Sequence, residues 1–145
     1  MPETSGTATA GRTRRARPVY TNLGLSDLMQ YRLPLAGILS ILHRASGALL
    51  FLVGIPLALY LLQLSLSSAE GYAAFESLAS GFFIKLVLLV LIWAFMHHLC
   101  AGIRYLIIDL HVGVEKEQAH FSAKVAFGVS AVLTLIAGAK LFGAF

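Results

Sequence analysis

The stretch that decides the fold is FFIKLVLLVLIWAFMHHLCAGIRYLIID, residues 82–109. Residues 86–96 within it are all apolar, and the whole stretch exceeds the about 20 residues that a helix needs to cross a bilayer. Its second half then adds two histidines, an arginine and an aspartate. Ionisable side chains are costly inside a membrane and usually face a helix bundle or a polar cavity. The stretch therefore predicts a membrane-spanning helix with a binding site toward its carboxyl end.

The composition of the whole chain also indicates a membrane protein. Of its 145 residues, 58% are hydrophobic and only 12% are charged, and the mean hydropathy is +0.80. Soluble domains carry about 25% charged residues, so this chain has too little polar surface to face water on all sides. The single cysteine, Cys100, excludes an intrachain disulfide and is expected to be a small packing residue.

Two further spans are expected, one on each side of the first stretch. Residues 34–64 begin with Pro34, which suits the first turn of a helix, and Pro56 should bend this helix mildly. Residues 122–143 form the last span, whereas residues 65–81 and 111–120 are polar and are expected to be loops. The predicted fold class is an all-α integral membrane protein with three transmembrane helices. Small residues recur at four-residue intervals in the last span and predict a helix-packing stripe: Ala126, Ser130, Thr134 and Gly138.

The charge distribution predicts the orientation in the membrane. Residues 1–17 are expected to be a disordered, basic cytoplasmic tail, and residues 18–145 to be the membrane anchor. The first predicted loop is acidic, whereas the second carries Lys116 with Lys124 beside it. The positive-inside rule then puts the N-terminus in the cytoplasm and the C-terminus in the periplasm. Because membrane topology explains the basic residues, we expect no nucleic-acid partner.

One face of the second span carries polar residues in helical register. At about 100° per residue, Gly102, Tyr105 and Asp109 lie within about 40° of His98, and Asp109 lies about 16 Å along the axis from it. A glycine one turn from His98 leaves a flat space in which a planar macrocycle ligated by that histidine could lie. His97 points about 100° away, so we expect it to contact another helix.

The first span begins with a second polar group. Ser40, Arg44 and Gly47 share a face, and His43 lies at its margin. Arg44 and His43 are suited to bind carboxylates such as haem propionates, or a carbonyl group to which Ser40 could also donate. The residues by themselves leave two interpretations open, which are a binding site for such a group and polar side chains that only hold helices together.

Two segments resemble the signatures of the cytochrome b membrane-anchor subunits of succinate dehydrogenase. The first is SILHRASG, residues 40–47, preceded by Arg17-Pro18, and the second is HLCAGIRYLIID, residues 98–109. The resemblance runs from Arg17 to the end of the chain. It implies one of two membrane anchors in a four-subunit complex, whose other members are a second anchor, an iron–sulfur subunit and a flavoprotein.

The resemblance implies a haem b shared between the two anchors. His98 would be one axial ligand of the haem iron, and the second anchor would supply the other. His43, Arg44 and Tyr105 would lie on the propionate side. Many relatives have histidine where this chain has Tyr105, which can still donate a hydrogen bond but brings no positive charge.

The resemblance also implies part of a ubiquinone site. Ser40 and Arg44 would bind the quinone, and Asp109 would mark the entry of protons from the cytoplasm. Flavin and iron–sulfur clusters would reside only on the partner subunits, so this chain is expected to do no redox chemistry alone. The short N-terminus favours a bacterial inner membrane over a mitochondrial one. Two other functions stay open, an anchor of a quinol:fumarate reductase and a haem-free structural or transport subunit.

Overall fold

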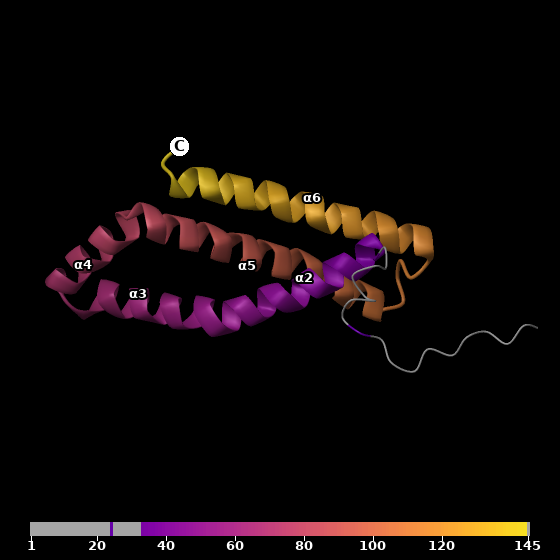
Figure 1. Cartoon of the computed structure of the whole chain (residues 1–145), viewed down its shortest axis with the longest axis horizontal. Coiled ribbons are helices and arrows are strands. Elements are labelled where there is room, and N and C mark those ends of the chain that lie inside the picture. Colours follow the sequence, from indigo (N-terminus) through magenta and orange to yellow (C-terminus); the bar gives the residue numbers. More distant parts are fainter. Residues whose placement is uncertain (1–23, 25–32, 145) are drawn as a thin grey trace, which may run out of the picture. The chain divides into compact units, whose positions relative to one another are not determined.

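The computed structural model describes Gly24 and residues 33–144, and this part of the chain contains helices and no strands. The predicted basic tail, residues 1–17, lies outside the described residues. Figure 1 shows the elements along the chain. They are α2 (Leu35–Leu49), the π-helical turn η1 (Leu50–Gly54), α3 (Ile55–Ser67), α4 (Ala69–Ser80), α5 (Phe82–Asp109) and α6 (Lys116–Leu141).

Three helices are long and apolar enough to cross a membrane, as predicted. The first is the continuous helix Leu35–Ser67, made of α2, η1 and α3, and the others are α5 and α6. The bounds of α5 agree with the prediction at both ends. Helix α6 begins at Lys116, inside the region predicted to be a loop. Its first turn is polar and carries Glu117, whose charge interacts favourably with the helix dipole there, so the apolar pattern alone placed its start too late.

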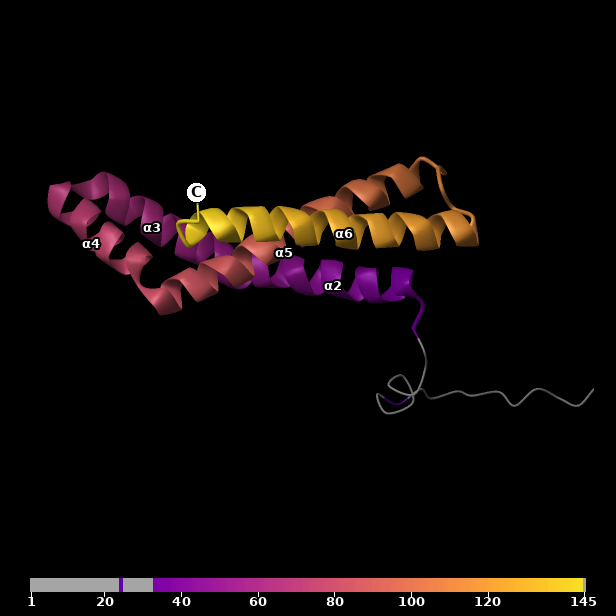
Figure 2. The same ribbon diagram turned by 90° about the horizontal axis from the view of Figure 1, so that it is seen from above.

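The first spanning helix contains a π-helical turn directly before Pro56. Proline lacks an N–H group, and its ring crowds the carbonyl group four residues earlier in an α-helix. The turn Leu50–Gly54 is wider than an α-helical turn, and Pro56 occupies the first turn of α3. The mild bend predicted at Pro56 thus falls where the regular hydrogen-bond pattern changes, and α3 leaves α2 in a different direction in Figure 2.

The predicted loop over residues 65–81 is wrong, because most of it forms helix α4, Ala69–Ser80. Ser68 has an extended backbone and caps this helix, since its hydroxyl accepts a hydrogen bond from the Gly71 N–H at 3.0 Å. Glu70 adds a favourable charge to the first turn. A serine cap and an acidic first turn are helix-start signals that the polar composition of the segment concealed.

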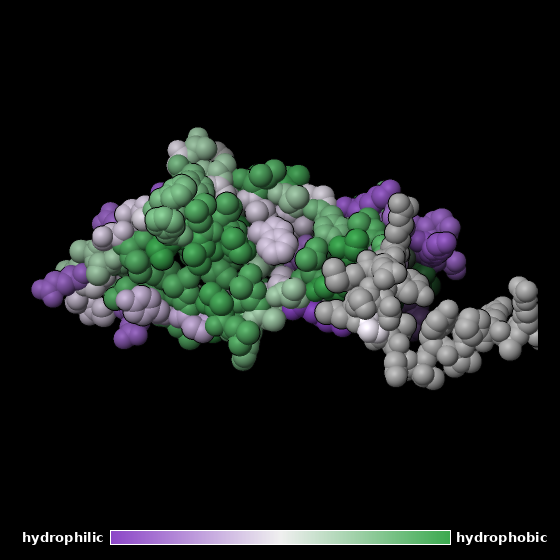
Figure 3. All heavy atoms as spheres, viewed as in Figure 1, coloured by the Kyte–Doolittle hydropathy of each residue, from purple (hydrophilic) through white to green (hydrophobic). Residues whose placement is uncertain are grey.

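The core of the three-helix bundle is small. Helix α5 contacts both α2 and α6, and α2 also contacts α6. The buried cluster consists of one leucine and three alanines: Leu39, Ala101, Ala123 and Ala126. Many large apolar side chains instead point outward, and Figure 3 shows apolar side chains over much of the middle of one face, with less apolar ones among them. This distribution suits lipid or other protein chains around the bundle, not water.

The small-residue stripe of α6 is a packing surface, as predicted. Ala126, Ser130 and Gly138 are buried and Thr134 is half-buried. A Cβ atom at Gly138 would lie 2.7 Å from Cδ1 of Leu89 on α5, so the two helices approach closely at this position. Small residues allow such an approach in membranes, where van der Waals contact largely drives helix association.

A larger side chain on this stripe should separate the helices. We expect Gly138→Leu to lower the free energy of unfolding by about 1–3 kcal/mol, because even a Cβ atom at Gly138 would lie 2.7 Å from Cδ1 of Leu89. Gly128→Leu is the matched control, since Gly128 is exposed on the same helix and a Cβ atom there meets nothing within 4 Å. Loss of helical circular dichroism with increasing dodecyl sulfate in mixed micelles measures the difference. Equal midpoints for the two variants would contradict the described packing of α5 on α6.

Candidate functional site

Two histidines from different spanning helices meet where α2 lies against α5. The rings of His43 and His98 are stacked, with their centroids 4.1 Å apart and their planes inclined by 11°. The sequence placed His43 only at the margin of the polar face of its helix. The packing of α2 against α5 therefore brings together two of the predicted site residues.

The His98 ring is held by the backbone of the opposite helix. Its Nδ1 lies 3.0 Å from the carbonyl oxygen of His43. Because a carbonyl oxygen can only accept, Nδ1 carries the hydrogen and Nε2 has the unshared lone pair. Histidines that bind metals commonly donate their other ring N–H to a carbonyl or carboxylate in this way. The geometry thus fits a half-buried imidazole that presents Nε2 to a metal ion.

Two glycines accommodate the histidine pair. The sequence predicts a flat space beside Gly102 for a macrocycle, but the nearest side-chain atom to a Cβ built there is Nε2 of His43, at 3.5 Å. His43 therefore lies next to that space. Gly47 makes the closer contact, since a Cβ atom at this position would lie 2.8 Å from Cε1 of His98.

Tyr105 extends this cluster and has an unsatisfied hydroxyl group. Its ring centroid lies 5.2 Å from that of His43, and its hydroxyl oxygen is buried without a hydrogen-bond partner among the described residues. A buried polar group without a partner costs about 1–3 kcal/mol. A carboxylate placed here, such as a haem propionate, would remove that cost, so Tyr105 also fits the group expected from the sequence.

The predicted quinone-binding residues lie together at the start of the first span. The Nη2 of Arg44 donates a hydrogen bond to Oγ of Ser40 at 3.1 Å. Ser40 is half-buried and Arg44 is exposed, so the other donors of the guanidinium group point out of this chain's core. Asp109 is exposed at the end of α5, apart from the histidine cluster.

His97 lies between α5 and α6, in agreement with the expected helix contact. It is 1% exposed, and its ring packs against Trp93 and Phe127 at centroid distances of 5.6 and 5.3 Å. Its Nε2 has no hydrogen-bond partner among the residues that the structure describes. His97 and His98 are adjacent in the sequence but have different surroundings. The ring of His97 packs against aromatic side chains, whereas the ring of His98 is hydrogen-bonded to a backbone carbonyl group.

Arg104 joins α5 to α6, a role that sequence reasoning missed. It is 7% exposed and donates from Nε to Oγ of Ser122 at 2.9 Å and from Nη2 to the carbonyl oxygen of Ala119 at 3.0 Å. The sequence contained one signal for this contact, which was an arginine near the end of one span and a serine near the start of the next.

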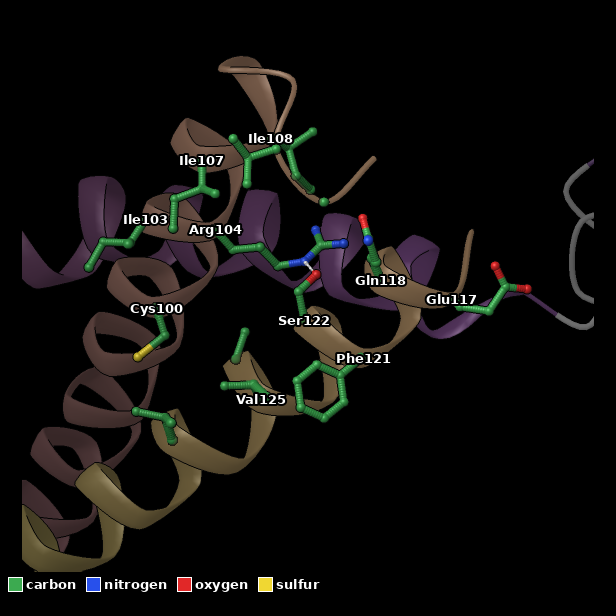
Figure 4. Close-up of a pocket in the computed structure, with 14 residues that line it drawn as sticks. Cys100, Ile103, Arg104, Ile107, Ile108, Glu117, Gln118, Phe121, Ser122 and Val125 are labelled. Atoms are coloured by element: carbon green, nitrogen blue, oxygen red, sulfur yellow. Dashed lines mark hydrogen bonds between the residues drawn. The ribbon is translucent and has the colours of Figure 1, made fainter. Parts of the chain in front are cut away.

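Figure 4 shows Arg104 pointing toward Ser122 in an apolar pocket of about 860 Å³ between α5 and α6. None of the predicted site residues lines this pocket.

These features define a multi-span helical membrane protein that carries an anchored imidazole and an arginine–serine pair in its first two spans. Residues 13–137 match the family described as succinate dehydrogenase/fumarate reductase transmembrane subunit. The chain belongs to this family, so the resemblance found in the sequence is confirmed.

Several curated relatives have names that agree with the family. The succinate dehydrogenase cytochrome b556 subunit of Coxiella burnetii is 39% identical over 113 residues, which cover 77% of this chain and 90% of that protein. The b556 subunit of Paracoccus denitrificans is 39% identical over 119 residues, with 79% and 91% covered. The cytochrome b560 subunit of Reclinomonas americana is 33% identical over 126 residues, with 83% of each chain covered.

Replacing Arg104 should weaken the contact between α5 and α6 without removing the positive charge. A lysine has a single ammonium group and cannot reproduce the two directed bonds to Ser122 and Ala119. We expect Arg104→Lys to lose about 1.5–3 kcal/mol of unfolding free energy, the worth of one charged hydrogen bond. Lys124→Arg, at an exposed position of α6, is the control. An unfolding midpoint for Arg104→Lys that matches the control would mean that these bonds contribute nothing.

Proposed function

We propose that this chain is the cytochrome b membrane anchor of a succinate:quinone oxidoreductase. The observation that carries the proposal is the His98 imidazole, whose Nδ1 is bonded to the His43 carbonyl oxygen and whose Nε2 is left to bind a metal ion. Relatives that share 39% of the aligned residues are named as cytochrome b556 subunits of succinate dehydrogenase. In this proposal, a flavoprotein and an iron–sulfur subunit oxidise succinate and deliver the electrons.

The haem b in this proposal would be held by residues of α2 and α5. His98 would supply one axial nitrogen and a second anchor subunit the other. Arg44 has exposed donors for a propionate, and Tyr105 has a buried hydroxyl without a partner. His43 would lie beside the His98 ring on the same side. When bound, the haem would supply a one-electron redox centre.

The quinone site in this proposal lies around Ser40 and Arg44. Both side chains can donate hydrogen bonds to a carbonyl oxygen, and the bond between them fixes their relative position. Arg44 would favour the reduced and more negatively charged quinone, because a preorganised positive charge stabilises developing negative charge. Asp109, exposed at the end of α5, would take part in the entry of protons.

We further propose a bacterial inner membrane with the N-terminus in the cytoplasm and the C-terminus in the periplasm. The distribution of Lys and Arg over the flanking segments supports the orientation, and the bacterial relatives named above support a bacterial membrane. A phosphatase reporter fused after Phe145 should be active in the periplasm, and a reporter inserted near Glu115 should be cytoplasmic. The reverse pattern of activities would overturn the orientation and the cytoplasmic position of the quinone site.

The haem assignment is tested by replacing each of the two adjacent histidines. We expect His98→Ala to lose haem b, because its Nε2 is the proposed ligand. His97→Ala should keep the haem, since its ring lies among aromatic side chains on the α6 side. Reduced-minus-oxidised spectra of the purified complex measure both. Haem bands of normal intensity in the His98 variant would mean another ligand, whereas no haem in the unaltered complex would favour a haem-free structural subunit.

The quinone assignment is tested by separating two activities of the complex. We expect Ser40→Ala and Arg44→Ala to leave succinate oxidation by a small artificial acceptor unchanged, while ubiquinone reduction falls. A neutral hydrogen bond is worth about 0.5–1.5 kcal/mol and a charged one about 1.5–3 kcal/mol, so the Arg44 variant should lose more, up to about a hundredfold.

Spectra of both variants serve as the control for assembly, since Arg44 also lies on the proposed propionate side. If both variants keep the haem and reduce ubiquinone at the unaltered rate, Ser40 and Arg44 are only polar packing residues of α2.

A further inference from the structure

Two residues with no assigned role, Ser46 and Gly47, surround the imidazole of His98. Ser46 is 1% exposed and Gly47 is half-buried. Both belong to α2, on the turn that follows His43, and both make their nearest described contacts with the His98 ring or with the carbonyl group that holds it.

Ser46 completes the hydrogen bonding around Nδ1 of His98. Its hydroxyl group donates to the carbonyl oxygen of His43 at 2.9 Å, and the same oxygen accepts from Nδ1 of His98 at 3.0 Å. The Ser46 Oγ also lies 3.4 Å from that Nδ1. A hydroxyl that donates its only hydrogen to the carbonyl has lone pairs left for the Nδ1–H. The imidazole N–H is thus shared between two oxygen acceptors, and rotation of the ring would break both contacts.

Gly47 lies against the His98 ring and leaves the space that the ring occupies. A Cβ atom here would lie 2.8 Å from Cε1 and 3.2 Å from Nδ1 of His98. The first distance is too short for two carbon atoms that are not bonded to each other, so either the ring or the backbone of α2 would have to move. The stacked His43 ring, 4.1 Å away, limits movement on one side. A displaced ring loses the geometry of its bond to the His43 carbonyl and turns Nε2 in a new direction.

We propose that Ser46 and Gly47 are positioning residues for the axial histidine, and that together they set the angle at which His98 presents Nε2 to the haem iron. This inference rests on the proposed function of His98. Loss of partners behind a metal ligand commonly weakens metal binding by 10–100-fold. The orientation of an axial imidazole plane also affects the electron paramagnetic resonance spectrum of a low-spin ferric haem, which gives a readout independent of enzyme activity.

The experiment uses the assembled complex purified from membranes through a tag on this chain. We expect Gly47→Ala to weaken haem retention by about tenfold, measured as transfer of haem to apomyoglobin. Gly37→Ala is the matched control on the same helix, because a Cβ there meets Pro34 only at 3.6 Å, an ordinary contact. Ser46→Ala should shift or broaden the largest g value of the ferric haem, and Ser46→Thr, which keeps the hydroxyl, should restore it.

Three outcomes separate this inference from the proposed function. If His98→Ala loses the haem while the Gly47 and Ser46 variants match the unaltered complex in retention and g value, the positioning role is wrong and the ligand assignment stands. If His98→Ala keeps the haem, the ligand assignment is wrong and the positioning role falls with it. If Gly47→Ala does not accumulate in the membrane, the g values of Ser46→Ala and Ser46→Thr test the positioning role by themselves. An unaltered g value in Ser46→Ala would then contradict that role.

Discussion

The arrangement of the site depends on one hydrogen bond between two spanning helices. The bond runs from Nδ1 of His98 on α5 to the carbonyl oxygen of His43 on α2. It forms only because Gly47 leaves room for the ring against α2. In a membrane, where water cannot satisfy an exposed imidazole N–H or a displaced carbonyl, such a bond fixes the protonation of the ring as well as its direction. The stacked histidines and the nearby Tyr105 follow from this close approach of the two helices.

The rest of the bundle is held by contacts that differ from those of a soluble protein. The buried residues are mostly alanine, serine and glycine, and the large apolar side chains lie outside. Contact between α5 and α6 combines the small-residue stripe, the aromatic surroundings of His97 and the two bonds of Arg104. These contacts lie between α5 and α6, so the outer faces of the helices stay available for lipid and for other subunits of the proposed complex.

The proposed binding site lies partly outside the core of this chain. Arg44 and Ser40 belong to α2 but keep donors outside the core of this chain, which suits a site completed by partner subunits. The buried hydroxyl of Tyr105 lacks a partner among the described residues, which suits a group shared between two anchors. In the proposed complex, a second anchor subunit would complete this site.

The sequence by itself determined the number of spans, the bounds of α5, the helix-packing stripe of α6 and the family. These follow from apolar length, helical periodicity and two motifs that lie within single helices. It missed α4, because polar composition outweighed the Ser68 cap, and it began α6 too late. Only the tertiary structure decided that His43 stacks on His98, that Gly47 makes room for the His98 ring, and that Arg104 joins α5 to Ser122 and Ala119. The physical reason is that periodicity gives the direction of a side chain around its own helix, whereas a contact between helices depends on their crossing and register, which no single helix contains.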